Sequence, residues 1–411
     1  MTRPPGGQRA DDGPAADGPA DRRALLSSLV ALVGVALALR PQIIAIGPLQ
    51  TAIQDDLGIS HGVIGALSAI PILCMGIFAP LGPRVARRLG ARDAVAVSVA
   101  LIVVFGLLRV AVPTPSLLLV LTFGIGIGMG LAGPVLPMIV RRNLPAHPAL
   151  GTGAYATGIV IGALAAAGLA VELAGPDHDW RRSLAVVSVG GLVSLGIWLL
   201  FAPRDGRVDG EVAPAHIAWS HPAGWVLGLL FGLQSLLFYG IAAWLAAVYV
   251  DRGWSEAAAA QLLAIFMAVG LLVTITLPLV ADRVGTRRGQ LVGSAAATLI
   301  GLIGLAVLPE PAALWAVLLG VGTGAIFPLV LTLPVDAGGA PADVAATAAR
   351  MLLIGYVLSA SGPFVLGLAR DVTGNFATSL WLLVFMAVLL VGLAAVITPQ
   401  RLHRIGMTRH A

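Results

Sequence analysis

"PRVARRLGAR", residues 83–92, returns as "PLVADRVGTR", residues 278–287, with Pro, Val, Ala, Arg, Gly and Arg at matching positions 195 residues apart. The same offset superposes Gly58 and Ser60 on Gly253 and Ser255. A repeat that keeps one constant offset indicates a chain built from two similar halves.

The composition is that of a membrane protein. Of the 411 residues, 58% are hydrophobic and only 11% are charged, and the mean hydropathy is +0.95. Soluble domains carry roughly 25% charged residues, so the chain is predicted to cross the membrane many times. The net charge of +5 comes from arginines in short loops between apolar runs. This placement is a topology signal and argues against a nucleic-acid partner.

Twelve apolar runs are each long enough to cross a bilayer, which takes about 20 residues. Lipid cannot hydrogen-bond the backbone, so each run is predicted to be a helix. Six runs fall in each copy of the repeat, which predicts an all-α membrane protein with two pseudo-symmetric six-helix halves. The runs lie at about 24–53, 60–82, 93–112, 116–140, 150–173, 181–202, 222–250, 255–280, 289–308, 312–335, 344–369 and 376–398.

Arginine placement predicts the orientation in the cell membrane. With both termini in the cytoplasm, eighteen arginines lie in cytoplasmic loops and tails and four lie outside, as the positive-inside rule requires. The expected organisation is a disordered cytoplasmic tail, an N-terminal half, a cytoplasmic linker, a C-terminal half and a second cytoplasmic tail, over residues 1–22, 23–202, 203–221, 222–399 and 400–411.

The basic loop at 278–288 resembles the signature loop of the major facilitator superfamily. It keeps Asp282, Arg283, Gly285, Arg287 and Arg288 of the family pattern, whereas the first copy has Arg87 where the aspartate belongs. The resemblance implies a gating role for Asp282, with Arg283 and Arg287, at the cytoplasmic face.

A closer resemblance is to the cyanate and 2-nitroimidazole transporter branch of that superfamily. It is carried by "LRPQIIAIGPLQTAIQDDLGIS" (39–60) in the first span and "GLQSLLFYGIAAWLAAVYVDRGWS" (232–255) in the seventh. The stretches 65–90, 180–186 and 355–374 are similar to its second, sixth and eleventh spans. The resemblance implies secondary active or facilitated transport of a small anionic or polar solute by alternating access.

Arg40 is the principal candidate for a binding residue. It lies about 22 Å along the first span at 1.5 Å per residue, close to the bilayer centre. An arginine there costs about 2.5–3.5 kcal/mol on insertion scales, and no Asp or Glu lies near the middle of any span. A bound anion is therefore the expected counter-ion, since a guanidinium offers paired donors to two oxygens. A structural arginine paired with backbone carbonyls is the alternative.

Further candidates surround this position. Pro41 and Pro48 remove helix hydrogen bonds, which indicates either an ordinary kink or a bent helix that opens backbone to a central cavity. The seventh span is the symmetry partner of the first, so Gln234 and Tyr239 are predicted to line the same cavity, although Tyr239 could also serve interhelical packing. Tyr155 and Tyr356 could reach the cavity or cap helix packing.

Other classes of function fit the sequence less well. There is no nucleophile elbow, zinc motif or phosphate loop, so neither an enzyme nor a cofactor or metal site is predicted. A membrane receptor would normally carry a soluble output module, for which the short linker and tails leave little room. The remaining alternative is a multidrug or metabolite efflux transporter of the same superfamily. The expected partners are a small-molecule solute and the lipid bilayer, and the protein is expected to be a monomer.

Overall fold

The computed structural model describes residues 19–203, 222–280, 286–336 and 341–397. In this part of the chain all regular structure is helical, and twelve helices are long and apolar enough to cross a membrane. The predicted all-helical class is therefore confirmed.

The first half contains the helices α1 to α9 and one short 3-10 turn. Their bounds are α1 (Pro19–Ala36), α2 (Pro41–Ile44), α3 (Ile46–Leu57), α4 (His61–Phe78), η1 (Ala79–Leu81), α5 (Gly82–Leu89), α6 (Ala91–Val110), α7 (Pro115–Asn143), α8 (Pro148–Ala174) and α9 (Trp180–Phe201). The helix α1 starts inside the segment 1–22 that was predicted to be disordered, because Pro19 provides a first helical residue with its φ already fixed.

The second half contains six long helices. Their bounds are α10 (Pro222–Asp251), α11 (Glu256–Val280), α12 (Arg287–Val307), α13 (Ala312–Asp336), α14 (Pro341–Thr373) and α15 (Ala377–Val396). Corresponding helices of the two halves begin at nearly constant spacing: α4 and α11 start 195 residues apart, α6 and α12 start 196 apart, and α9 and α15 start 197 apart. The repeat seen in two loops therefore extends over the bundle.

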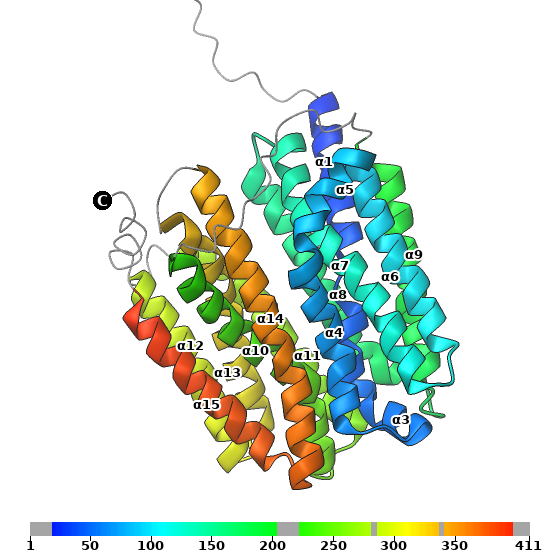
Figure 1. The fold of residues 1–411 in the computed structure, drawn as a ribbon, viewed down its shortest axis with the longest axis vertical. Coiled ribbons are helices and arrows are strands. Elements are labelled where there is room, and N and C mark those ends of the chain that lie inside the picture. Colours follow the sequence, from blue (N-terminus) through cyan, green and yellow to red (C-terminus); the bar gives the residue numbers. More distant parts are fainter. Residues whose placement is uncertain (1–18, 204–221, 281–285, 337–340, 398–411) are drawn as a thin grey trace, which may run out of the picture.

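The two halves lie side by side (Figure 1). α4 packs along α14, α8 packs against α11, and α3 packs against α10. Gly65 and Gly367 let α4 and α14 approach closely: an added Cβ would lie 2.3 Å from the carbonyl oxygen of Pro363 at Gly65 and 2.3 Å from that of His61 at Gly367. The absence of side chains at such glycines lets helices from different halves touch by their backbones.

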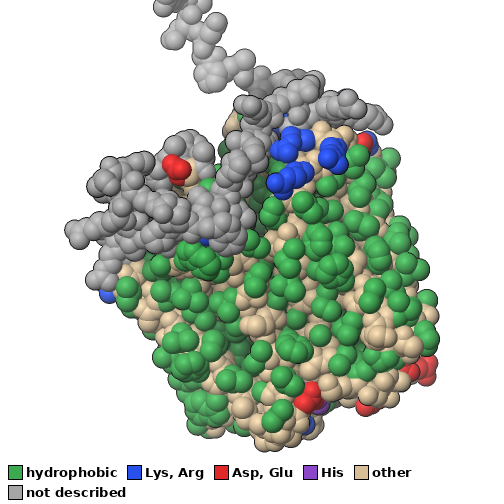
Figure 2. Space-filling model, viewed as in Figure 1, with side chains coloured by type: hydrophobic (Ala, Val, Ile, Leu, Met, Phe, Trp, Pro, Cys, Tyr) green, Lys and Arg blue, Asp and Glu red, His purple; other side chains and the backbone are tan. Residues whose placement is uncertain are grey.

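The two ends of the bundle carry different charges. The terminal face, where α1 begins and α15 ends, carries Arg84, Arg87 and Arg88 on α5, and Figure 2 shows arginines gathered there. The opposite, distal face carries Asp56, which hydrogen-bonds Arg181 and Trp180 within the first half. Between these faces the outer surface is mostly hydrophobic, as lipid requires.

Candidate solute-binding site

The first membrane helix is broken at its middle. α1 ends at Ala36, residues 37–40 form turns and bends, and the four-residue α2 starts with Pro41 as its first residue. α3 then begins at Ile46 and carries Pro48 in its first turn. Proline is tolerated in the first turn of a helix and not in its interior, so the two prolines fit three short segments and not one long helix. Arg40 occupies the end of the break.

Arg40 points towards the other half of the molecule. Its guanidinium carbon lies 5.5 Å from the centre of the Tyr239 ring on α10, and it also interacts electrostatically with Tyr356 on α14. Within its own half, Nη1 donates a hydrogen bond to Sδ of Met75 on α4 at 3.0 Å. The site is therefore built from both halves, with Arg40 between them.

Two of the other four predicted binding residues, Tyr239 and Tyr356, lie beside this arginine. Tyr239 is buried, whereas Arg40, Tyr155 and Tyr356 each keep part of their surface accessible. Tyr155, on α8, and Tyr356 pack against the hydrophobic cluster that contains Tyr239. Arg40 and Tyr155 belong to the first half and Tyr356 to the second.

Gln234 occupies a different position on α10. It is buried, and its Oε1 accepts a hydrogen bond from the Ser235 hydroxyl at 3.0 Å. Its hydrogen-bond partner is therefore its chain neighbour and not Arg40. Tyr239, five residues later, is the α10 side chain that reaches the arginine.

The hydrogen-bonding capacity of Arg40 is only partly used. A guanidinium has five N–H donors, and a thioether sulfur is a weak acceptor. No ion pair with a carboxylate is made by Arg40 within the described ranges. An aromatic ring stabilises a cation by its negative face but does not neutralise it. The arrangement offers a positive charge with donors available to an anionic or polar ligand.

The distal ends of the two halves are tied together by carboxylates. Asp371 on α14 accepts from the backbone N–H groups of His61 and Gly62 at the start of α4, at 2.9 and 2.8 Å, and contacts Nδ1 of His61 at 2.9 Å. His178, in the loop before α9, contacts Glu256 at the start of α11 at 3.0 Å. Both contacts bridge the halves, so the interface is closed at this end.

The gating residues are placed only in part. Asp282 and Arg283 lie outside the described residues, and Arg287 is the first residue of α12. Among the described residues, no group of three or more His, Cys, Asp or Glu side chains is arranged to hold a metal ion.

Sequence reasoning missed two contributors to the site. Met75 contacts Arg40 from α4, but nothing distinguishes it from other apolar residues of that span. Gln42, a polar residue directly after the Arg40–Pro41 pair, is buried and hydrogen-bonded, and its polarity within the apolar run was the available signal.

The sequence profile described as Major Facilitator Superfamily matches residues 25–349, most of the chain. The chain belongs to the major facilitator superfamily. It is therefore a multi-pass membrane transporter of small solutes and not an enzyme.

Three relatives from this superfamily align with nearly the whole chain. The cyanate transport protein CynX of Escherichia coli K12 is 29% identical, over 89% of this chain and 94% of its own length. The 2-nitroimidazole transporter of the same organism is 29% identical, over 86% of this chain and 90% of its own length. The uncharacterized transporter YycB of Bacillus subtilis 168 is 28% identical, over 87% and 89%. The predicted similarity to the cyanate and 2-nitroimidazole branch is confirmed.

Solved major facilitator structures share the fold. A D-xylose-proton symporter superimposes with a TM-score of 0.73 at 20% identity, covering 90% of this chain and 97% of its own. A bacterial homologue of the human lysosomal transporter Spinster, in an inward-facing conformation, superimposes with a TM-score of 0.75 at 15% identity. The match covers 96% of this chain and 100% of the other. At such identities the similarity shows the arrangement of helices alone.

Proposed function

We propose that the protein carries a small anionic or polar solute of cyanate or nitroimidazole type across the cell membrane by alternating access, with Arg40 as its central binding residue. The observation that carries the proposal is the partly accessible Arg40 guanidinium at the interface of the halves, beside Tyr239 and Tyr356 and without a carboxylate partner in the described ranges.

The chemistry of the cluster favours a small planar anion or a nitro compound. A guanidinium presents two parallel N–H donors to two oxygens of a nitro group or carboxylate, or to one end of cyanate. The phenols of Tyr155 and Tyr356 can donate further hydrogen bonds to the same ligand. The two relatives named for cyanate and 2-nitroimidazole support this class of solute.

A site between the halves also suits the transport cycle. Tyr239 and Tyr356 belong to the second half and Arg40 to the first, so rocking of one half against the other changes access to the ligand from either side. The distal contacts of His61 and Asp371 would then break when the distal side opens.

The terminal face is proposed to be cytoplasmic, because arginines concentrate there. The single native cysteine, Cys74, is buried, so an introduced surface cysteine reports its own side of the membrane. A membrane-impermeant maleimide added to intact cells should label Asp177→Cys and not Arg88→Cys. The opposite labelling pattern would invert the proposed topology.

Counterflow into proteoliposomes tests the solute class. Vesicles loaded with unlabelled cyanate should accumulate labelled cyanate, and external nitrate or 2-nitroimidazole should compete. Ethidium, a hydrophobic cation, should neither move nor compete. Movement of ethidium without any effect of the anions would replace the proposal by the efflux alternative.

A further inference from the structure

A buried polar network lies behind the break in the first helix. Nη2 of Arg109, on α6, donates to Oε1 of Gln42 on α2 at 2.7 Å. Nε2 of Gln42 in turn donates to the Ser188 hydroxyl on α9 at 2.9 Å, and that hydroxyl donates to the carbonyl oxygen of Leu184 at 2.7 Å. All three side chains are buried, with exposures of 0 to 2%.

Gly106 makes room for this network. It lies one turn before Arg109 on α6, and a Cβ at this position would come 2.6 Å from the Ser188 hydroxyl and 2.9 Å from Nε2 of Gln42. Real Cβ atoms essentially never approach so closely. The hydrogen bond between Gln42 and Ser188 therefore depends on a residue without a side chain at 106.

The segment that the network holds is too short to be stable by itself. α2 spans four residues and contains three backbone hydrogen bonds, from the N–H groups of Ile43 and Ile44 to Arg40 and from that of Ala45 to Pro41. Isolated helices need about 12–15 residues even to be marginal in water. The side-chain bonds of Gln42 tie this turn to two long helices of the same half, and Arg40 lies only two residues away.

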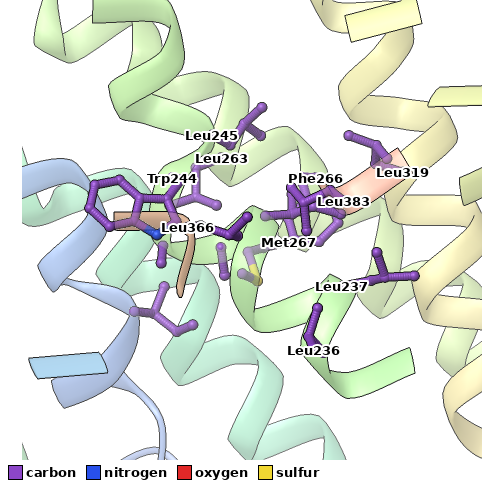
Figure 3. Packing of buried hydrophobic residues seen from close by; sticks show 14 of the residues in the cluster. Leu236, Leu237, Trp244, Leu245, Leu263, Phe266, Met267, Leu319, Leu366 and Leu383 are labelled. Carbon is purple, nitrogen blue, oxygen red and sulfur yellow. The ribbon is translucent and has the colours of Figure 1, made fainter. Parts of the chain in front are cut away.

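The second half shows that the fold does not require these polar groups. At the offset of 195 residues shared by the loops after the first and seventh spans, Gln42 corresponds to Leu237, which is buried in the hydrophobic core and lies in the apolar cluster of Figure 3. At the 196-residue spacing of α6 and α12, Arg109 corresponds to Leu305, which is also buried in that core. The half with the continuous helix thus has leucine at the places of Gln42 and Arg109.

Arg109 is costly where it lies. Its Nε and Nη1 have no hydrogen-bond partner, and it forms no ion pair in the described ranges. A buried polar group without a partner destabilises a protein. A leucine at this position would not carry that cost. The hydrogen bond that Arg109 donates to Gln42 gives this buried arginine a structural role.

We propose that Arg109, Gln42 and Ser188 are positioning residues that fix α2 and so aim the Arg40 guanidinium at the solute. This inference rests on the proposed function of Arg40. It predicts that loosening the network moves the binding residue without touching the ligand itself.

Two measurements on the full-length protein in nanodiscs and proteoliposomes test the proposal. The first is backbone hydrogen exchange over residues 37–49, and the second is KM for cyanate uptake. The test variants are Ser188→Ala and Gln42→Leu. The matched control is Ser183→Ala, which removes another buried hydroxyl of α9 that donates to the carbonyl oxygen of Ala170 and lies outside the network.

Ser188→Ala should speed exchange of the α2 amides about fivefold, as expected for one lost hydrogen bond, and should raise KM by a similar factor. Gln42→Leu removes two hydrogen bonds, so it should raise both the exchange rate of the α2 amides and KM by more than about tenfold. The control Ser183→Ala should change the exchange rate and KM by less than about twofold each. Exchange in the test variants that matches the control, or faster exchange with an unchanged KM, overturns the proposal. If the wild type takes up no cyanate, the proposed function fails, and exchange alone decides whether the network holds α2.

Discussion

The first helix and its symmetry partner α10 occupy equivalent places and have different structures. α10 runs unbroken for 30 residues from Pro222 to Asp251, whereas the first span is divided into α1, α2 and α3. At the offset of 195, Pro41 corresponds to Leu236 and Pro48 to Ala243. The prolines of the first span are therefore absent from the equivalent positions of the continuous helix.

The two helices also meet each other. A Cβ at Gly47 would lie 2.7 Å from the carbonyl oxygen of Ala242, which is the residue equivalent to Gly47 in the second half. The broken segment therefore rests on the backbone of the continuous one. Tyr239 therefore comes from a continuous helix of one half, whereas Arg40 comes from a break in the equivalent helix of the other half, next to Pro41.

The largest expected effect is at Arg40. Arg40→Ala should abolish uptake, by more than about a hundredfold, since a charge-assisted pair is lost. Arg40→Lys should restore little because an ammonium lacks the planar pair of donors. Initial uptake rates of cyanate in proteoliposomes measure this. The control is Ser235→Ala at the equivalent position of α10, which should reduce uptake less than about threefold; equal losses would remove the asymmetry between the halves.

Pro41→Leu copies the residue of the continuous helix. The new N–H can bond to the carbonyl oxygen of Leu37 and extend α1 through the break, since proline in a helix interior costs about 3 kcal/mol. We expect uptake to fall about tenfold with an unchanged or higher melting temperature. The reciprocal change, Leu236→Pro in α10, should lower the melting temperature strongly. Retained uptake in Pro41→Leu would show that the break is dispensable.

Gln234→Leu tests the polar position of the continuous helix. Because its hydrogen bond runs to Ser235 and not to Arg40, we expect KM for cyanate to change by less than about threefold, with little change in kcat. A loss as large as that of Arg40→Ala would mean that the two halves share the binding energy equally.

The smallest effect concerns the distal ends of the two helices. Asp56 lies near the end of α3, and Asp251, its equivalent, ends α10, where it accepts a hydrogen bond from Arg370. The hydrogen bond from Arg181 lowers the pKa of Asp56 below its usual value. Its stabilising effect is complete above about pH 4, the pKa of an unfolded aspartate, and is lost as the pH falls through the lower folded pKa.

Asp56→Asn should therefore lower the melting temperature at pH 7 by only about 1–2 °C, because partly exposed pairs contribute little. The difference between mutant and wild type should be smaller at pH 3 than at pH 7, because pH 3 lies below the pKa of an unfolded aspartate. Thermal unfolding at the two pH values measures the difference, and an unchanged difference at pH 3 would show that the carboxylate acts otherwise than by its charge.

Much of the architecture could be predicted from local signals. The apolar runs gave all twelve spans, because a bilayer imposes length and hydrophobicity on each one. The repeat of the loop at 83–92 in the loop at 278–287 predicted the two halves, because equivalent loops at one offset imply equivalent helices between them. Boundaries in the first span were less predictable: the run 24–53 is three helices, since its proline positions mark where helices begin and not only where one bends.

By itself, the sequence determined the class of protein, its superfamily and the exceptional position of Arg40. The class and the position of Arg40 follow from composition and from a charge in an apolar run, and the superfamily follows from the resemblance of the 278–288 loop to its signature. None of these needs knowledge of spatial neighbours. Only the tertiary structure decided that Tyr239 and Tyr356 face Arg40, that Gln234 turns to Ser235, and that Gln42, Arg109 and Ser188 form one network. The last three lie on α2, α6 and α9, as many as 146 residues apart, and such contacts depend on helix rotation and packing that no local pattern encodes.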